Sequence, residues 1–351
     1  MSTDKSLLDR IGIFLKDYVT PYSEQLDHDS DLMRQTFIEF KQQQLFSYYI
    51  PSQWGGFDLS TAEKITIQEL FGMHGGALAF LQAQTATASW LLQQSDNTQL
   101  KNTLLTQVAT GERTLGNCTY QMKPNHPGQL FGTKVKSGYR LSGKLNMTSG
   151  YKLFDDLVLG FHSDNTELFA VIPYATTSDN SLMASNAISS ISMTSINTVS
   201  LSFDQYFIPD DCIIIESPIH SFFQQYRLFP PFAFPIGIAK QAMQLTSQAK
   251  ILARPSLKQQ HESIQSELEQ LKQEIISLAC LSHKTSQKID SAFARMAKIT
   301  LEAVNFAIFL SGGAGLVSSS PIQRLYRELV VWLIPRAFPE VIENLFETEQ
   351  A

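Results

Sequence analysis

Hydrophobic positions recur at three- and four-residue steps through the first part of the chain, and this spacing predicts helices. The spacing is clearest at the start of the chain, in Leu7, Leu8, Ile11, Phe14, Leu15 and Tyr18. Ser60 and Glu63 match a capping box, a pair of residues that satisfies the first amides of a helix. Further helices are expected over 31–44, 77–93 and 100–108, with breaks at glycine pairs. Residues 1–113 are therefore predicted to form a helical domain.

The hydrophobic period changes after about Thr114, where apolar and polar residues begin to alternate. Val199, Leu201 and Phe203 fall on one face of a strand, and short apolar runs at 157–161 and 168–172 end in turn residues. The connections are polar, and the stretch 179–197 is rich in Ser and Asn. Short strands with such connections predict an antiparallel β domain over residues 114–217.

Helical spacing returns for the rest of the chain, in segments expected over 228–252, 258–288, 290–316 and 322–334. The second segment is polar except for a narrow apolar seam formed by Ile264, Leu268, Leu271 and Ile275. One narrow seam is typical of a helix in a bundle or at an interface. Residues 218–351 are therefore predicted to form a four-helix bundle, and the whole chain an α+β protein of three domains.

Composition excludes several classes of protein. The net charge is −6 and no basic run exceeds two residues, which argues against a nucleic-acid partner. The longest apolar stretches are shorter or more broken than a membrane span requires. Three widely spaced cysteines and an N-terminus without an apolar core predict a cytoplasmic protein. The seven histidines show no metal-ligand spacing, and only 17% of residues are charged, which favours a homo-oligomer.

Several local patterns appear in the order found in the acyl-CoA dehydrogenase family, which this chain resembles over about residues 45–328. The motifs that carry the resemblance are Pro51 to Gly56, Gly138 to Gly143, Asn146 to Gly150, Phe207-Ile208-Pro209, Gly237-Ile238-Ala239, Ser311-Gly312-Gly313 and Pro321 to Glu328. The resemblance implies a helical domain, a small β domain and a helical bundle. The short spacing from Gly143 to Gly150 is closer to the flavin monooxygenase branch of the superfamily.

The resemblance also implies an FAD held between the β domain and the bundle. Thr119, Thr148 and Ser149 match positions that contact the flavin. Arg254 and Gln265 match residues that reach the FAD of a neighbouring subunit, and Gly312 and Gly313 match glycines at its adenosine end. A homodimer or homotetramer is implied, together with an electron-transfer or flavin reductase partner.

The chain departs from the family at the catalytic base. The family's glutamate falls at Arg336, and an alternative position on the first bundle helix falls at Arg227. A guanidinium cannot accept a proton, so no catalytic base is identified. The tryptophan that would pack on the flavin is Asn146, and the phosphate-binding Gly-Ser turn is missing after Thr119.

Three functions follow from these observations. The first is FAD-dependent desaturation of an acyl thioester or a related small molecule. The second is a flavin-dependent monooxygenase, which needs no carboxylate base at that position. The third is a non-catalytic paralogue with a structural or partner-binding role.

Other residues are weaker candidates. His74, Gln82 and Gln84 lie near a helix break that could face a ligand cleft. Arg324 and Arg327 could serve a cofactor, but surface or intersubunit ion pairs are the simpler expectation.

Overall fold

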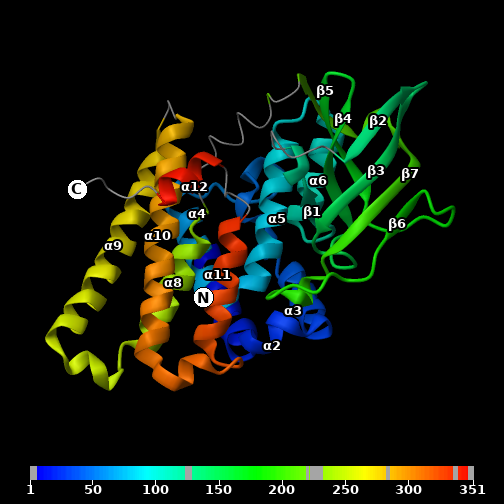
Figure 1. Ribbon diagram of the computed structural model, residues 1–351. Helices are drawn as coiled ribbons and strands as arrows, with labels where there is room; N and C mark the ends of the chain where they lie inside the picture. The colour runs from blue at the N-terminus through cyan, green and yellow to red at the C-terminus, as the bar shows by residue number, and fades with distance from the viewer. Residues whose placement is uncertain are drawn as a thin grey trace, which may run out of the picture.

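The computed structural model describes residues 6–122, 129–218, 221, 232–281, 285–334 and 339–346. Helices, a sheet and a second set of helices follow one another along the chain (Figure 1). This order confirms the predicted fold class. The element type changes between Ala109 and Leu115 and again after Pro218, although the domain boundaries at 113 and 217 stay predictions.

The N-terminal helices agree with the hydrophobic spacing. They are α1 (Leu7–Phe14), α2 (Ser23–His28), α3 (Ser30–Gln42), α4 (Thr61–His74), α5 (Gly76–Gln93) and α6 (Thr98–Ala109). The capping box is present at the start of α4, where Ser60 and Glu63 each bond to the other's backbone amide. Asp29 caps α3 by accepting bonds from two amides of its first turn.

The strands form one twisted sheet. They are β1 (Leu115–Cys118), β2 (Leu130–Val135), β3 (Gly138–Thr148), β4 (Asp156–Ser163), β5 (Thr166–Pro173), β6 (Leu182–Ala184), β7 (Val199–Pro209) and β8 (Ile213–Pro218). Their order is β6-β7-β3-β2-β4-β5-β8, with β1 paired to β4. The sheet is mostly antiparallel, as predicted, but β1 and β2 each pair with β4 in parallel.

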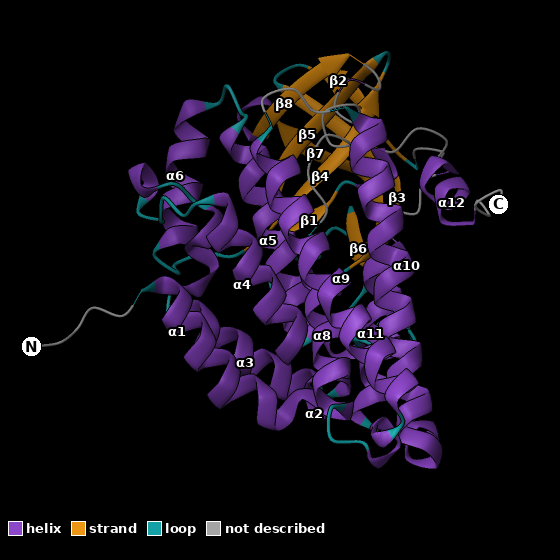
Figure 2. Cartoon of the chain, turned by 90° about the vertical axis from the view of Figure 1, so that its left-hand side faces the viewer, coloured by secondary structure: helices purple, strands orange, loops and turns teal. Residues whose placement is uncertain are grey.

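The sheet lies on one side of the molecule and the bundle on the other, with α5 between them (Figures 1 and 2). Contacts of α5 with β1 on one side and with α8 and α11 on the other fix this arrangement. In β4, seven of eight residues are buried, because both faces of this central strand are covered. The space between sheet and bundle is therefore walled along one side by α5.

The bundle consists of α8 (Phe234–Thr246), α9 (Pro255–Cys280), α10 (Ser286–Ser311) and α11 (Pro321–Leu333), followed by α12 (Pro339–Phe346). The predicted break between the second and third helices was wrong by several residues. The helix α9 ends at Cys280, and α10 starts after Thr285, whose hydroxyl accepts a bond from the amide of Lys288. The Thr285 side chain caps α10 and so sets the start of this helix, and the spacing of apolar residues gives no information about caps.

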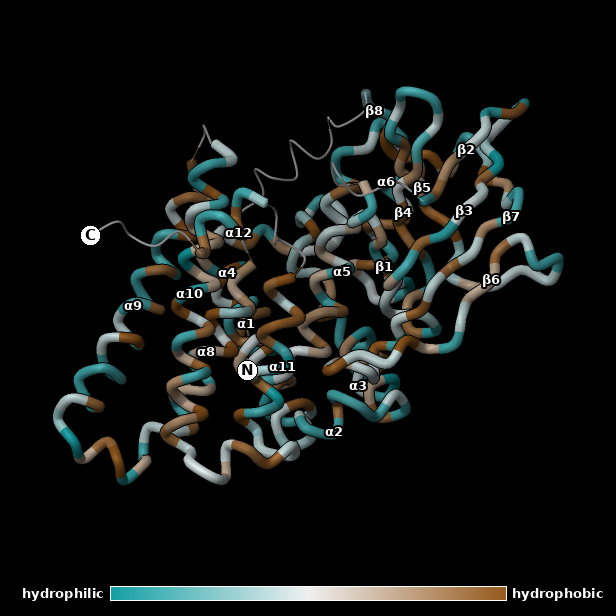
Figure 3. Tube along the Cα trace, viewed as in Figure 1, coloured by the Kyte–Doolittle hydropathy of each residue, from teal (hydrophilic) through white to brown (hydrophobic). Residues whose placement is uncertain are grey.

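The seam predicted on α9 is confirmed, since Ile264, Leu268, Leu271 and Ile275 are buried and most other residues of α9 are not. Figure 3 shows hydrophilic and hydrophobic positions alternating along this helix. The segment Ser286–Leu316 is long and apolar enough to cross a membrane by length and composition. About a third (33%) of its most apolar window is buried, and α10 packs against α8, α9 and α11.

Two glycines allow α4 and α8 to cross in close contact. A Cβ placed on Gly72 would lie 2.1 Å from the carbonyl oxygen of Phe234, and one on Gly237 would lie 2.0 Å from that of Glu69. Each helix thus presents a bare backbone to the other. The glycine of the Gly237-Ile238-Ala239 motif therefore has a packing reason for its identity.

Substituting Gly237→Ala is expected to destabilise the fold by about 2–3 kcal/mol or more, because the added methyl has no space to occupy. Gly12→Ala is the matched control. Gly12 lies inside α1 and has nothing within 4 Å of an added Cβ. The control should raise stability by about 0.5–1 kcal/mol through helix propensity. Urea unfolding of the two variants measures both effects, and equal shifts in the two would contradict the close crossing.

Candidate functional site

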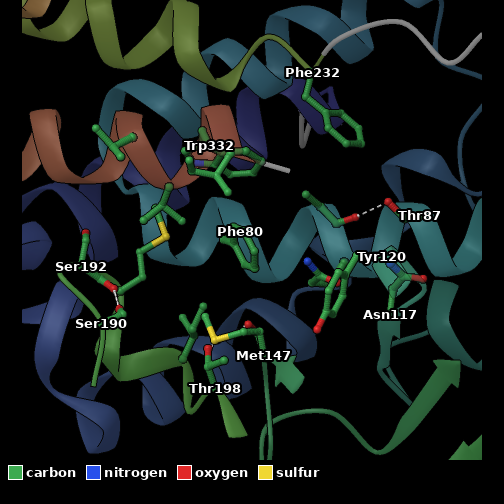
Figure 4. A pocket seen from close by; sticks show the side chains of 18 of the residues that line it. Phe80, Thr87, Asn117, Tyr120, Met147, Ser190, Ser192, Thr198, Phe232 and Trp332 are labelled. Atoms are coloured by element: carbon green, nitrogen blue, oxygen red, sulfur yellow. Dashed lines mark hydrogen bonds between the residues drawn. The ribbon is translucent and has the colours of Figure 1, made fainter. Parts of the chain in front are cut away.

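A cavity of about 600 Å³ lies where the sheet, α5 and the bundle meet. Four segments that are far apart in the sequence build its walls (Figure 4). The lining residues from α5 are Phe80, Ala83, Gln84 and Thr87, and those from the sheet and its turns are Asn117, Cys118, Thr119, Tyr120, Met147 and Ser149. Those from the 190–198 loop are Ser190, Ile191, Ser192, Met193, Ile196 and Thr198. Those from the bundle and its approach are Phe232, Pro235, Phe293, Met296, Val330, Val331, Trp332 and Ile334.

Several polar groups of the cavity lie on its sheet side, and Gln84 and Thr87 of α5 and Ser190 and Ser192 of the loop add others. The hydroxyls of Ser149 and Thr198 are 2.9 Å apart, and the Thr119 hydroxyl donates to the side-chain oxygen of Asn117 at 3.2 Å. Figure 4 shows Thr198 and Asn117 on that side, across from Phe232 and Trp332. One wall can therefore exchange hydrogen bonds with a ligand while the opposite wall is apolar and aromatic.

No lining residue that the structure describes is an Asp, Glu, His, Lys or Arg. The two that can ionise are Cys118 and Tyr120, and burial raises the pKa of each to about 12. Both are therefore neutral at physiological pH. The cavity presents no formal charge from the described residues, so it suits a neutral ligand or the neutral part of a larger one.

Tyr120 occupies part of the wall near the position where the family would place a tryptophan. Its hydroxyl donates to the carbonyl oxygen of Asn146 at 2.6 Å. The Asn146 side chain turns away and bonds to Gln129 at 2.8 Å. Tyr120 thus supplies an aromatic ring from a different segment of the chain. The asparagine at position 146 gave no indication of this.

The structure brings together three of the predicted flavin contacts. Thr119 and Ser149 line the cavity. Thr148 lies behind the wall, fully buried, with its hydroxyl 3.3 Å from the sulfur of Cys118, which does line the cavity. Whether these residues contact a cofactor stays a prediction.

The remaining predicted contacts lie elsewhere. Arg254, Gln265, Gly312 and Gly313 are all exposed. Figure 1 shows the start of α9 and the end of α10 at the same end of the bundle, which is remote from the α11 residues that line the cavity. The Arg254 side chain forms no hydrogen bond or ion pair with the residues that the structure describes. Arg227 and Arg336, at the two base positions, lie outside the described residues.

Of the weaker candidates, only Gln84 lines the cavity. Gln82 is fully buried and accepts a bond from the Tyr48 hydroxyl at 2.7 Å. His74 bonds to the Thr20 hydroxyl at 2.7 Å, and burial, followed by the charge of Arg324, lowers its pKa.

The ion pairs expected for Arg324 and Arg327 are present, but they lie inside the chain and not at a surface or subunit interface. Both pair within the chain, and the side chain of Arg324 is only 4% exposed. Arg324 bonds to Glu328 one turn later at 2.7 Å, with that carboxylate almost completely buried. Burial is the larger influence on Glu328 and raises its pKa, while Arg324 opposes the shift. The sequence motif identifies the charged residues of α11, but it does not show that α2 covers the face of α11 on which they lie.

Sequence reasoning missed the 190–198 loop, which supplies six lining residues. Its Ser- and Asn-rich composition predicted a solvated connection. The only signal against that reading was the presence of Ile191, Met193 and Ile196 among the polar residues. It also missed Met147, whose φ of 55° places it in the left-handed region at a bulge of β3.

Comparisons with known proteins agree with this architecture. The model of the acyl-CoA dehydrogenase N-terminal domain matches residues 2–112. No curated protein sequence matches the chain significantly. Among solved structures, butyryl-CoA dehydrogenase from Megasphaera elsdenii has a TM-score of 0.83 at 14% identity, covering 97% of this chain and 96% of that one.

Two other similar structures come from differently named proteins. Nitrososynthase from Micromonospora carbonacea var. africana has a TM-score of 0.78 at 15% identity, over 97% of this chain and 96% of that one. The structure titled PigA with FAD and proline has a TM-score of 0.78 at 16% identity, over 97% of both chains. Identities this low establish a shared fold and nothing finer. The chain therefore carries the N-terminal domain of the acyl-CoA dehydrogenases and has the fold of that superfamily.

Proposed function

We propose that the cavity holds the ring system of a flavin. The isoalloxazine ring is flat and uncharged, with polar atoms along part of its edge. The cavity matches these properties, because its volume is about 600 Å³, its described lining carries no charge, and part of its wall offers hydroxyls. The similar structure that was determined with FAD supports the same assignment.

The residues suited to hold the ring divide by chemistry. Thr119, Ser149 and Thr198 offer hydroxyls that can donate to ring oxygens or nitrogens. Phe80 and Trp332 offer apolar faces, and their rings lie 5.4 Å apart. When bound and reduced, a flavin supplies two electrons to dioxygen, so that one oxygen atom enters the substrate and the other leaves as water.

The function we favour is that of a flavin-dependent monooxygenase, and the observation that carries it is that no described residue lining the cavity is a carboxylate. Desaturation of an acyl thioester removes an α-proton and needs a positioned base. No carboxylate lines the cavity among the described residues. The internal segments outside the description, 123–128, 219–220, 222–231, 282–284 and 335–338, contain no Asp or Glu in their sequence.

The residues of the cavity would then act by exclusion and orientation. Apolar side chains such as Met296 and Val331 keep water from the reacting atoms. Cys118 and Tyr120 stay protonated, so neither can serve as a base at neutral pH. The substrate is expected to be neutral where it enters, because an unpaired charge there would lose its hydration without compensation.

We also propose a homodimer or homotetramer, in which the exposed end of the bundle faces a second copy. Phe309 and Leu316 are 82% and 78% exposed at that end, next to Gly312 and Gly313. The positive charge of Arg254 is suited to a phosphate of the neighbouring copy's cofactor. Reducing equivalents would come from a flavin reductase or another electron-transfer partner.

A flavin in this cavity predicts that Ser149→Ala raises the dissociation constant for FAD roughly threefold to tenfold, the effect of one lost hydrogen bond. Ser163→Ala is the matched control, because Ser149 and Ser163 are both 8% exposed and Ser163 does not line the cavity. Titration followed by flavin fluorescence measures the constants. Equal constants for the two variants would place the flavin elsewhere. If the wild-type protein takes up no flavin, a structural or partner-binding role is the remaining function.

The lack of a carboxylate among the described lining residues predicts that the flavin-loaded protein is not bleached by acyl-CoA under anaerobic conditions. Supplied with a reduced flavin, it should consume dioxygen in proportion to a hydroxylated product from a neutral substrate. Absorbance near 450 nm, roughly where oxidised flavins absorb, follows the first test, and an oxygen electrode with product analysis follows the second. Rapid bleaching by an acyl-CoA would overturn the monooxygenase assignment in favour of desaturation.

A further inference from the structure

The 190–198 loop must be held in place by other segments. It has no strand partner along most of its length, yet it supplies six lining residues of the cavity. Met193 and Asn197 have φ values of 56° and 50°, in the left-handed region that costs free energy for residues other than glycine. Such a conformation persists only where surrounding contacts determine it.

The end of α2 supplies the contacts at 192–195, while the turn after β3 holds the end of the loop, where the amides of Gly150 and Tyr151 donate to the carbonyls of Ile196 and Asn197 at 2.8 and 3.2 Å. One carboxylate oxygen of Asp27 accepts bonds from the Ser192 hydroxyl at 2.7 Å and from the Met193 amide at 2.6 Å. The Ser195 hydroxyl donates to the Leu26 carbonyl at 2.5 Å. Ser192, Met193, Ser195 and Leu26 are buried, and Asp27 itself is only 6% exposed. Asp27 and Ser192 are separated by 165 residues in sequence.

The second carboxylate oxygen of Asp27 faces the bundle. It lies 3.5 Å from a guanidinium nitrogen of Arg327 on α11. Val330, three residues after Arg327, lines the cavity, as do Val331 and Trp332. Asp27 therefore joins two walls of the cavity, the loop and the end of α11, through one side chain.

Local chemistry alone does not favour an aspartate here. A negative charge in the last turn of a helix opposes the helix dipole, and burial removes its hydration. Two hydrogen-bond donors, one hydroxyl and one amide, compensate together with the ion pair to Arg327. A residue that is unfavourable for its own helix, but makes hydrogen bonds to distant segments, is expected where those segments must be held in a fixed position.

We propose that Asp27 is a positioning residue of the cavity, whose carboxylate sets the 190–198 loop against α11. It touches no ligand itself and acts through the residues it holds. This role rests on the proposed function only in taking the ligand of the cavity to be a flavin. The loop geometry itself does not depend on the identity of that ligand.

The experiment compares two buried aspartates in the full-length chain. Asp27→Asn keeps the size of the side chain and removes its charge. Asp156→Asn is the matched control, because Asp156 is 5% exposed, pairs with Arg113 at 2.6 Å and does not line the cavity. Hydrogen exchange of peptides covering 190–198 reports the loop without any ligand. Fluorescence titration with FAD reports the assembled cavity, and the melting temperature reports overall stability.

Asp27→Asn is expected to speed exchange in the loop about tenfold and to raise the dissociation constant for FAD about tenfold, the scale of a charged buried hydrogen bond. Asp156→Asn should lower the melting temperature and leave both other quantities unchanged. If Asp27→Asn does not fold, Ser192→Ala removes one of the same bonds and should shift both quantities in the same direction.

The proposal would be overturned if Asp27→Asn had the same loop exchange and FAD affinity as the wild type. It would also be overturned if both quantities changed only as much as they do in Asp156→Asn. A wild-type chain that binds no FAD would contradict the proposed function instead. In that case faster loop exchange in Asp27→Asn alone still supports the positioning role, and unchanged exchange still refutes it.

Discussion

The close crossing of α4 and α8 is the constraint on which the rest of the molecule depends. Gly72 and Gly237 each meet the opposite backbone, so the N-terminal helices and the bundle share one fixed contact. The helix α5 begins two residues after α4 ends, and Pro235 lies in the first turn of α8. Both elements line the cavity, so the crossing sets the separation of two of its walls.

Much of this fold could be predicted from residue patterns, because the patterns report local conformation. Apolar spacing located the N-terminal helices, and Ser60 with Glu63 located a helix start. The boundary between α9 and α10 was misplaced, because both helices carry continuous apolar spacing up to it. Among the described residues at this break, Thr285 caps α10, and a single threonine carries little signal in a sequence.

The candidate site was less predictable, because its walls come from segments that meet only in the folded chain. The family motifs led to Thr119 and Ser149, which lie on adjacent parts of the sheet. Nothing local marks Asp27 as a partner of Ser192, since their contact spans 165 residues. Arg254 and Gly312, which the motifs predicted to reach a cofactor in a second chain, are exposed and remote from the cavity. Sequence patterns therefore locate elements better than they locate contacts between elements.

The distribution of charge connects the fold to the proposed chemistry. On α11, Arg324, Arg327 and Glu328 face α2 and the start of α5, while the next turn presents Val330 and Val331 to the cavity. A Cβ on Gly76 would lie 2.6 Å from the Glu328 carboxylate, so this glycine leaves room for the buried pair. The protein thus places ion pairs directly behind a wall that is itself uncharged. Charges held there can fix the wall without entering the cavity, so the described wall itself presents only apolar side chains to a ligand.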